Sequence, residues 1–584
     1  MKILLVHPED TPEASPWADL TWDRIVDVGL GGMDTYKHWS QRLQCPVTTL
    51  NSLRCGFDVF EQVRRLLDQG RGQLVDEHGL DWWEIMSLLL HGELEKLILL
   101  QRFAQTVGSN DEVHVSRPGL HANLLQSLVP NQLHVFPRSR RSRKTGLAHY
   151  FRVARKLSTS QILDVFWDKY DAGYQFRAHF ARNRQSSQRP AVLVPSAYVN
   201  VSRTGIAYAN TFPQENFLLV ATRRSGWGQD LPSNMGARWL SSYASLRDRG
   251  VENADMEGRW LCLLKEVTRT TEFATLDSTG YLRNFMRWVR HGFEVRDAWR
   301  NVLDTEPVQG VLCADDSNPY TRIPLLLAQA RGLPNIACHH GALDGRYFFK
   351  RRYGDIIWVK GKMEEDYLVR TCGVPRDRVE IGAPALPATW NASQITTRHE
   401  SKPYLLFLSE LFETEGGRAE EYYRDVLPVL AELALSTERK LVVKLHPMES
   451  ERERAGMLAR MLSPRQKDVT RIVSGPLTEE LLAQAWFGIT IFSTVATECA
   501  VRGIPCFLCK WLEFWPYGYV EQFIRFGVGT GLNHPSEIKR IPEYLENNLV
   551  SKDARENCWQ PAAEGRLREL LTTFPQVVHD NAPG

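Results

Sequence analysis

Short apolar runs alternate with amphipathic stretches throughout the C-terminal half of the chain. The runs, each expected to be a strand, lie at 404–408, 441–445, 470–473, 487–492 and 505–509. The stretches between them have the spacing of helices, at 419–435, 449–462, 478–485 and 494–502. Strands that alternate with helices predict βαβ units and a parallel sheet. We therefore expect a doubly wound α/β domain over residues 402–540.

The first 390 residues repeat the pattern with longer interruptions. Apolar runs recur at 3–6, 112–115, 133–136, 191–194, 217–221, 308–313, 335–338, 356–359 and 379–381. Residues from about 225 to 305 lack clear strands and predict a helical insertion. A stretch rich in Pro, Ala, Ser and Thr at 382–403 predicts a linker. The expected architecture is therefore two facing Rossmann-like domains, 1–390 and 402–540, with a helical tail over 541–584.

Composition narrows the class of protein. The chain has 584 residues, of which 43% are hydrophobic and 24% charged, as in ordinary globular proteins. Its 71 Lys and Arg nearly balance its 69 Asp and Glu, and the net charge of +2 argues against nucleic acid as a partner. The ten cysteines are scattered, which fits a reducing compartment, and no Cys/His spacing predicts a metal site.

Two further features concern localisation. No stretch approaches the roughly 18–20 apolar residues of a membrane span, and charge follows the first apolar run too soon for a signal peptide. We therefore expect the cytoplasm. The basic run at 138–144 is either a solvated loop or a peripheral contact with anionic lipid headgroups or a phosphate-rich acceptor.

Polar residues follow directly after the strands of the second domain. In an open parallel sheet, ligands bind beyond the carboxyl ends of the strands. The residues that this rule selects are Ser409, Glu410, His446, Pro447, Ser474, Ser493 and Thr494. They should gather at one edge of the sheet and form a binding site there.

The most informative of these are His446 and the pair Ser493-Thr494. Pro447 confines His446 to extended geometry, and Lys444, two residues earlier, should share its face. Ser493-Thr494 begins a predicted helix, where N–H groups suit a phosphate, and Glu498 lies one turn further on, within reach of a ribose. The alternatives are a structural strand-end histidine and a plain helix N-cap.

The first domain offers candidates for the chemistry. Asp315 and Asp316 follow the strand at 308–313 and suit a general base or a nucleophile; the alternative is a helix N-cap. Cys338-His339-His340-Gly341 follows the next strand. Adjacent side chains of an extended chain point opposite ways, so we expect one histidine, His340, to face the second domain.

Residues 310–530 resemble the nucleotide-binding half of GT-B-fold glycosyltransferases. The likeness is to capsule and surface-polysaccharide enzymes: polysialyltransferases, capsular β-Kdo transferases and teichoic-acid glycerophosphate polymerases. It is carried by His446-Pro447, by Ser493-Thr494 with the later Gly503-Ile504-Pro505, and by His340-Gly341. The acidic-acidic-Gly motif of the polysialyltransferases has no match, because Glu413-Thr414-Glu415-Gly416 differs in spacing.

The resemblance implies a nucleotide-sugar-dependent glycosyltransferase that needs neither cofactor nor metal. The nucleotide would lie on the second domain, and the first would supply the acceptor site for a surface glycan or lipid-linked sugar. A CMP-activated acidic sugar, such as CMP-Kdo or CMP-sialic acid, is the first expected donor, and a UDP-sugar the next. The alternatives are a nucleotide-sugar 2-epimerase and a non-catalytic scaffold that binds nucleotide or carbohydrate.

Overall fold

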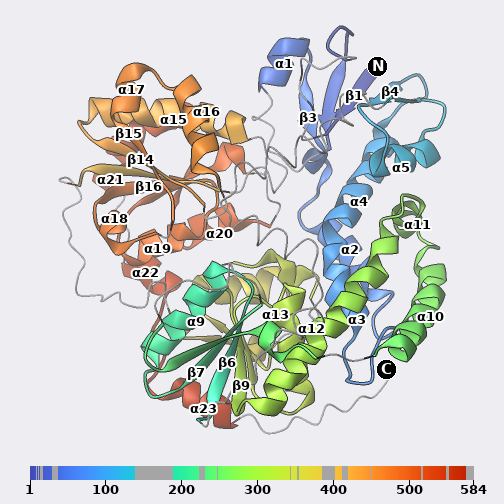
Figure 1. Ribbon diagram of the computed structural model, residues 1–584. Helices are drawn as coiled ribbons and strands as arrows, with labels where there is room; N and C mark the ends of the chain where they lie inside the picture. Colours follow the sequence, from blue (N-terminus) through green and yellow to red (C-terminus); the bar gives the residue numbers. More distant parts are fainter. Residues whose placement is uncertain are drawn as a thin grey trace.

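The computed structural model contains three parallel sheets, each covered by helices (Figure 1). It describes residues 1–137 without 8–9, 11, 13–16 and 29–36; 189–384 without 223–230, 246–247, 342 and 351–353; and 402–573 without 411–418, 447–448, 476, 514–516 and 548–551. The expected class, α/β with parallel sheets, is confirmed. Pro447, the basic run at 138–144 and most of the expected linker lie outside the described residues.

The first sheet is formed by residues 2–135 and has five strands in the order β3-β2-β1-β4-β5. The strands are β1 (Lys2–Val6), β2 (Arg24–Asp27), β3 (Val47–Thr49), β4 (Glu112–Val115) and β5 (Leu133–Val135). The helices are α1 (Lys37–Leu43), α2 (Asp58–Asp68), α3 (Trp82–Met86), α4 (His91–Thr106) and α5 (Leu120–Leu128).

The middle sheet has seven strands in the order β12-β11-β10-β9-β6-β7-β8. They are β6 (Ala191–Ser196), β7 (Phe217–Ala221), β8 (Met235–Trp239), β9 (Val308–Cys313), β10 (Asn335–Ala337), β11 (Ile356–Val359) and β12 (Val379–Ile381). β6 is buried along its whole length, because a parallel sheet is covered on both faces. Helices α9 (Val199–Thr211) and α13 (Pro319–Ala330) connect its strands; Asn318 caps α13 and Pro319 begins it.

The C-terminal sheet has six strands in the order β15-β14-β13-β16-β17-β18. They are β13 (Tyr404–Leu408), β14 (Lys440–Lys444), β15 (Thr470–Val473), β16 (Ala485–Thr490), β17 (Cys506–Cys509) and β18 (Thr530–Leu532). The main helices are α15 (Ala419–Ser436), α16 (Glu451–Met461), α19 (Val495–Val501) and α20 (Tyr519–Arg525). In all three sheets the strand order reverses beside the first strand, as in a Rossmann fold.

Two expectations for residues 1–390 need correction. They form two separate sheets rather than one, because the chain returns after β5 to start a new sheet at β6. The expected helical insertion also begins too early, since β8 lies inside it as an edge strand. The helices that remain are α10 (Gly250–Val267), α11 (Thr271–Ser278) and α12 (Phe285–Thr305).

These three helices pack against helices of the first sheet, beside which they lie in Figure 1. The Trp83 ring contacts those of Trp260, Phe273 and Phe285. Arg296 of α12 is fully buried and donates hydrogen bonds to the carboxylates of Asp76, Glu252 and Asp297. The segment therefore joins the first sheet to the middle one.

The last of the three C-terminal helices returns to the middle sheet, where α23 lies in Figure 1. They are α21 (Ile541–Asn547), α22 (Lys552–Cys558) and α23 (Arg566–Thr573). Leu567 and Leu570 of α23 are buried in the core of that sheet, and Arg566 donates to both carboxylate oxygens of Glu380. Among the described residues, no helix is both long and apolar enough to cross a bilayer.

Candidate functional site

The carboxyl edges of the middle and C-terminal sheets meet at the turn after β10. A Cβ built on Gly341 would lie 3.0 Å from Thr494 Cγ2 and 3.2 Å from Thr494 Oγ1, so these two segments are in contact. Nearby, the Gly345 backbone N–H donates to the Tyr519 hydroxyl at 2.7 Å. The chain segments that the strand-end rule selected in each domain are therefore brought together.

His446 stands at the end of β14 on this edge. Its backbone N–H donates to Glu449 Oε2 at 2.7 Å, and Arg454 holds the other oxygen of Glu449 at 2.7 Å. Burial lowers the pKa of His446 to about 4, with smaller contributions from the charges of Lys444 and His340. The imidazole is therefore neutral at pH 7. The charge of His340 acts on it, so His446 lies close to the domain built on the middle sheet, here called the middle domain.

Glu498 on α19 lies near positive charges from both domains. Burial raises the pKa of its carboxyl, and Arg203 of α9 and Arg502 oppose that rise. Oε2 of Glu498 is buried without a hydrogen-bond partner among the described residues. Thr494 occupies the N-cap of α19 but makes no side-chain cap bond, while the Ser493 hydroxyl accepts from the Val495 N–H at 3.4 Å. These groups keep hydrogen-bonding capacity that a ligand can use.

Three residues expected to hold the donor are engaged within the protein instead. Lys444 is buried and its ammonium donates to the carbonyl oxygens of Leu445 at 2.6 Å and Gly475 at 2.7 Å. Glu410 Oε1 accepts from Thr490 Oγ1 and from two backbone N–H groups of the turn before α19. Ser409 is buried against the Tyr423 hydroxyl. These bonds support the turns that carry His446 and Ser493.

On the middle domain, Asp315 and His340 lie around one tyrosine. The Tyr198 hydroxyl donates to Asp315 Oδ2 at 2.6 Å and lies 3.3 Å from His340 Nδ1. Burial lowers the pKa of His340, so its ring is neutral at pH 7 and able to take up a proton. The ring of His339 packs against that of His340, with centroids 4.3 Å apart.

Asp316, the other expected catalytic carboxylate, belongs to a buried ion network. Its side chain accepts from Lys350 Nζ at 2.6 Å, and Lys350 also donates to Asp344 at 2.8 Å. Arg322 donates to the Asp316 carbonyl oxygen at 3.0 Å and to Glu84 at 2.6 Å. These bonds tie Asp316 to Lys350, Asp344 and Arg322 within the protein.

The structure adds Tyr198, Arg203 and Lys360 to the site. Tyr198 and Lys360 each follow a strand of the middle sheet closely, so the strand-end rule could have found them. Lys360 Nζ donates to the carbonyl oxygens of His339 at 2.8 Å and Gly341 at 2.6 Å and so shapes the His-Gly turn. Arg203 lies inside a helix, and no sequence signal marks it.

The first sheet has a polar cluster of its own, which the sequence analysis did not single out. His7 follows β1, and its ring nitrogens lie 2.9 Å from Ser116 Oγ after β4 and 2.9 Å from His121 Nδ1 on α5. Ser116 Oγ donates to Asp10 at 2.5 Å. Burial lowers the pKa of His121 to about 3, so this histidine is neutral as well.

No model of a known protein family matches the chain, and no curated protein matches it in sequence. Among solved structures, it is similar to UDP-GlcNAc 2-epimerase from Neisseria meningitidis (11% identity, 66% of this chain, 100% of the other, TM-score 0.40). The calicheamicin glycosyltransferase CalG4 (14%, 66%, 95%, 0.35) and UGT2 from Phytolacca americana (11%, 66%, 94%, 0.38) are also similar. At these identities and scores, the functional assignment has to rest on the site itself.

Proposed function

We propose that the chain is a nucleotide-sugar-dependent glycosyltransferase whose donor lies between the middle and C-terminal sheets. The observation that carries this proposal is the contact of Gly341 with Thr494. It unites the carboxyl edges of two parallel sheets, and in such sheets the carboxyl edge is where ligands bind. Each edge contributes polar groups, so a ligand between them is held from both sides.

In this proposal the nucleotide lies against the C-terminal domain. Neutral His446 donates a hydrogen bond to the base or to a phosphate oxygen, and the hydroxyls of Ser493 and Thr494 donate to phosphate. Glu498 accepts from ribose hydroxyls through Oε2, which has no hydrogen-bond partner among the described residues. Arg203, whose charge acts on Glu498, offsets the charge that develops on the departing nucleotide.

The acceptor lies against the middle domain, where His340 takes the proton from its hydroxyl. The lowered pKa of His340 supports this assignment, because a general base must be unprotonated. Asp315 accepts from Tyr198 and so keeps that hydroxyl beside the imidazole. Holding donor and acceptor between two packed domains aligns the reacting atoms and excludes water.

The nucleotide is tested first, with thermal shifts in CMP, UDP, GDP and CDP. We expect the largest shift with CMP, and UDP next. A ligand at one hundred times its Kd stabilises a protein by about 2.7 kcal/mol. His446→Ala should abolish the shift, whereas His534→Ala, at an exposed histidine of the same domain, should retain it. Equal shifts in both variants would refute the assigned site.

Turnover is tested with the best-bound nucleotide-sugar and a panel of glycan and lipid-linked acceptors, with and without EDTA. A glycosylated acceptor formed in EDTA supports the proposal. An isomer formed from the donor alone identifies a 2-epimerase instead. Tight nucleotide binding without any turnover identifies a scaffold.

A further inference from the structure

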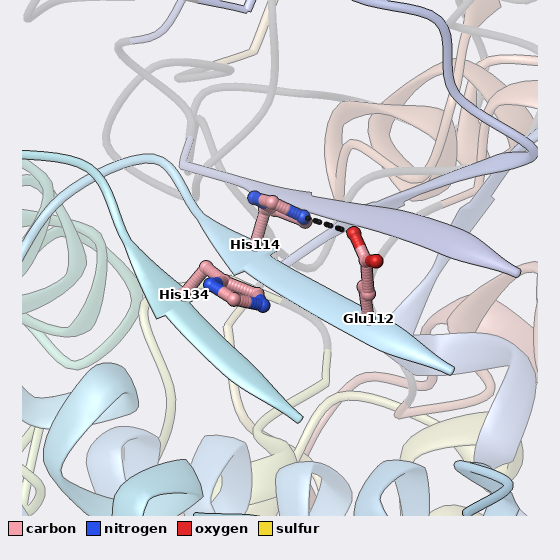
Figure 2. A group of neighbouring side chains, drawn as sticks. All are labelled: Glu112, His114 and His134. Carbon is pink, nitrogen blue, oxygen red and sulfur yellow. Dashed lines mark hydrogen bonds and ion pairs between the residues drawn. The ribbon is translucent and has the colours of Figure 1, made fainter. Parts of the chain in front are cut away.

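Three side chains with metal-ligating atoms gather on one face of the first sheet. Figure 2 shows Glu112 and His114 on β4 and His134 on β5. Alternate residues of a strand point to the same face, so Glu112 and His114 project together. His134 pairs in register with His114 on the neighbouring strand. The three side chains thus leave the sheet side by side.

Their ligand atoms have a spacing close to that of a metal site. His114 Nε2 lies 3.3 Å from Glu112 Oε2, and one ligand atom of each residue lies within 4.8 Å of the others. Zn–N and Zn–O distances of about 2.0–2.2 Å in a tetrahedral site separate neighbouring ligands by about 3.4 Å. His114 Nε2 and Glu112 Oε2 already have this separation. A small rotation of the exposed His134 ring brings its ligand nitrogen to the same distance.

Two aromatic side chains pack against His114, the central of the three ligands, and orient its ring. Trp22 packs edge-on against the His114 ring with centroids 5.1 Å apart, and Phe136 lies against it at 5.7 Å. A dication binds the carboxylate and the neutral imidazole, which are the deprotonated forms of these side chains. Lys2, whose Nζ is 4.0 Å from Glu112, is exposed and able to move aside.

We propose that Glu112, His114 and His134 form a binding site for a transition-metal dication of the Zn²⁺ class. Two imidazoles and a carboxylate are ligands that suit Zn²⁺, Co²⁺ and Ni²⁺ better than Mg²⁺ or Ca²⁺. Water completes the coordination on the open side, because two of the three ligands are exposed. The bound ion joins the edge strand β5 to β4. This site is separate from the proposed sugar-transfer site and does not depend on it.

Calorimetric titration of the metal-stripped full chain with Zn²⁺ at neutral pH tests the proposal. We expect one site, weakened by more than about tenfold in Glu112→Gln, in His134→Asn and in the double variant His114→Asn/His134→Asn. His534→Asn, which removes an exposed imidazole elsewhere, should bind as the wild type does. Unchanged affinity in the double variant would overturn the assignment, as would the absence of stoichiometric binding to the wild type.

Co²⁺ provides a second, spectroscopic measurement. Ligation by nitrogen and oxygen gives visible d–d absorption without a sulfur-to-metal charge-transfer band. The exposed thiols of Cys55 and Cys262 are competing ligands, and a charge-transfer band would assign the metal to them. The spectrum should survive in Cys55→Ser/Cys262→Ser, and its loss there would refute the site. Circular dichroism of each metal-free variant verifies its fold.

Discussion

Substituting Gly345 by alanine tests the contact between the middle and C-terminal domains. A Cβ at this position would lie 2.3 Å from Cδ1 and 2.5 Å from Cγ of Tyr517, far inside normal contact distance. The Tyr517 ring is not free to move away, since it is 6% exposed and stacks on Phe60 at 5.0 Å and on Tyr519 at 5.7 Å. The added methyl must therefore push the two domains apart locally.

The size of the effect follows from what is disturbed. Overpacking of a dense core costs about 1–3 kcal/mol, and a disrupted aromatic pair about 0.5–1.5 kcal/mol. Loss of the hydrogen bond from the Gly345 N–H to Tyr519 costs about 0.5–1.5 kcal/mol more. These contributions total about 2–6 kcal/mol. For a unit of about 150–250 residues, this lowers the Tm by about 4–24 °C.

Scanning calorimetry at one fixed scan rate measures the apparent Tm. Gly258→Ala is the matched control, because it lies in α10 with no atom within 4 Å of the added methyl. Alanine at that helical position should be neutral or stabilise by up to about 1 kcal/mol. If the Tm of Gly345→Ala equals the Tm of Gly258→Ala and of the wild type, the close packing of residue 345 against Tyr517 is refuted.

Three further predictions concern single side chains. Burial raises the pKa of Glu410 from 4.5 to about 7, so the folded state holds this proton more tightly and stability falls as pH rises through that range. Glu410→Gln should therefore flatten the fall of Tm between about pH 4.5 and pH 7, and a Tm difference from wild type that does not change with pH would contradict this. Arg296→Met leaves buried carboxylates unpaired and should cost about 3–5 kcal/mol in denaturant unfolding; a midpoint like that of the wild type would rule out the network. Tyr198→Phe should lower kcat at least about tenfold with little change in nucleotide Kd, and an equal loss in both would indicate a structural role instead.

The pattern of apolar runs was sufficient to predict the parallel α/β class and five of the six strands of the C-terminal sheet, all but the three-residue strand β18. This succeeded because burial on both faces leaves a local signature in each parallel strand. The same pattern placed His446, Ser493 and Thr494 at strand ends, and parallel connectivity requires such ends to share an edge. It could not divide residues 1–390 into two sheets, since periodicity does not say which strands pair.

Which polar groups remain available was decided only by the tertiary structure. Lys444 and Asp316 looked equivalent to their neighbours in the sequence, yet each is held by a partner more than thirty residues away. Asp315 meets Tyr198 across 117 positions of the chain. His134 joins Glu112 and His114 only through the register of two strands. Local sequence determines where a side chain leaves its strand, but the packing of distant segments determines whether that side chain is used within the protein or left for a ligand.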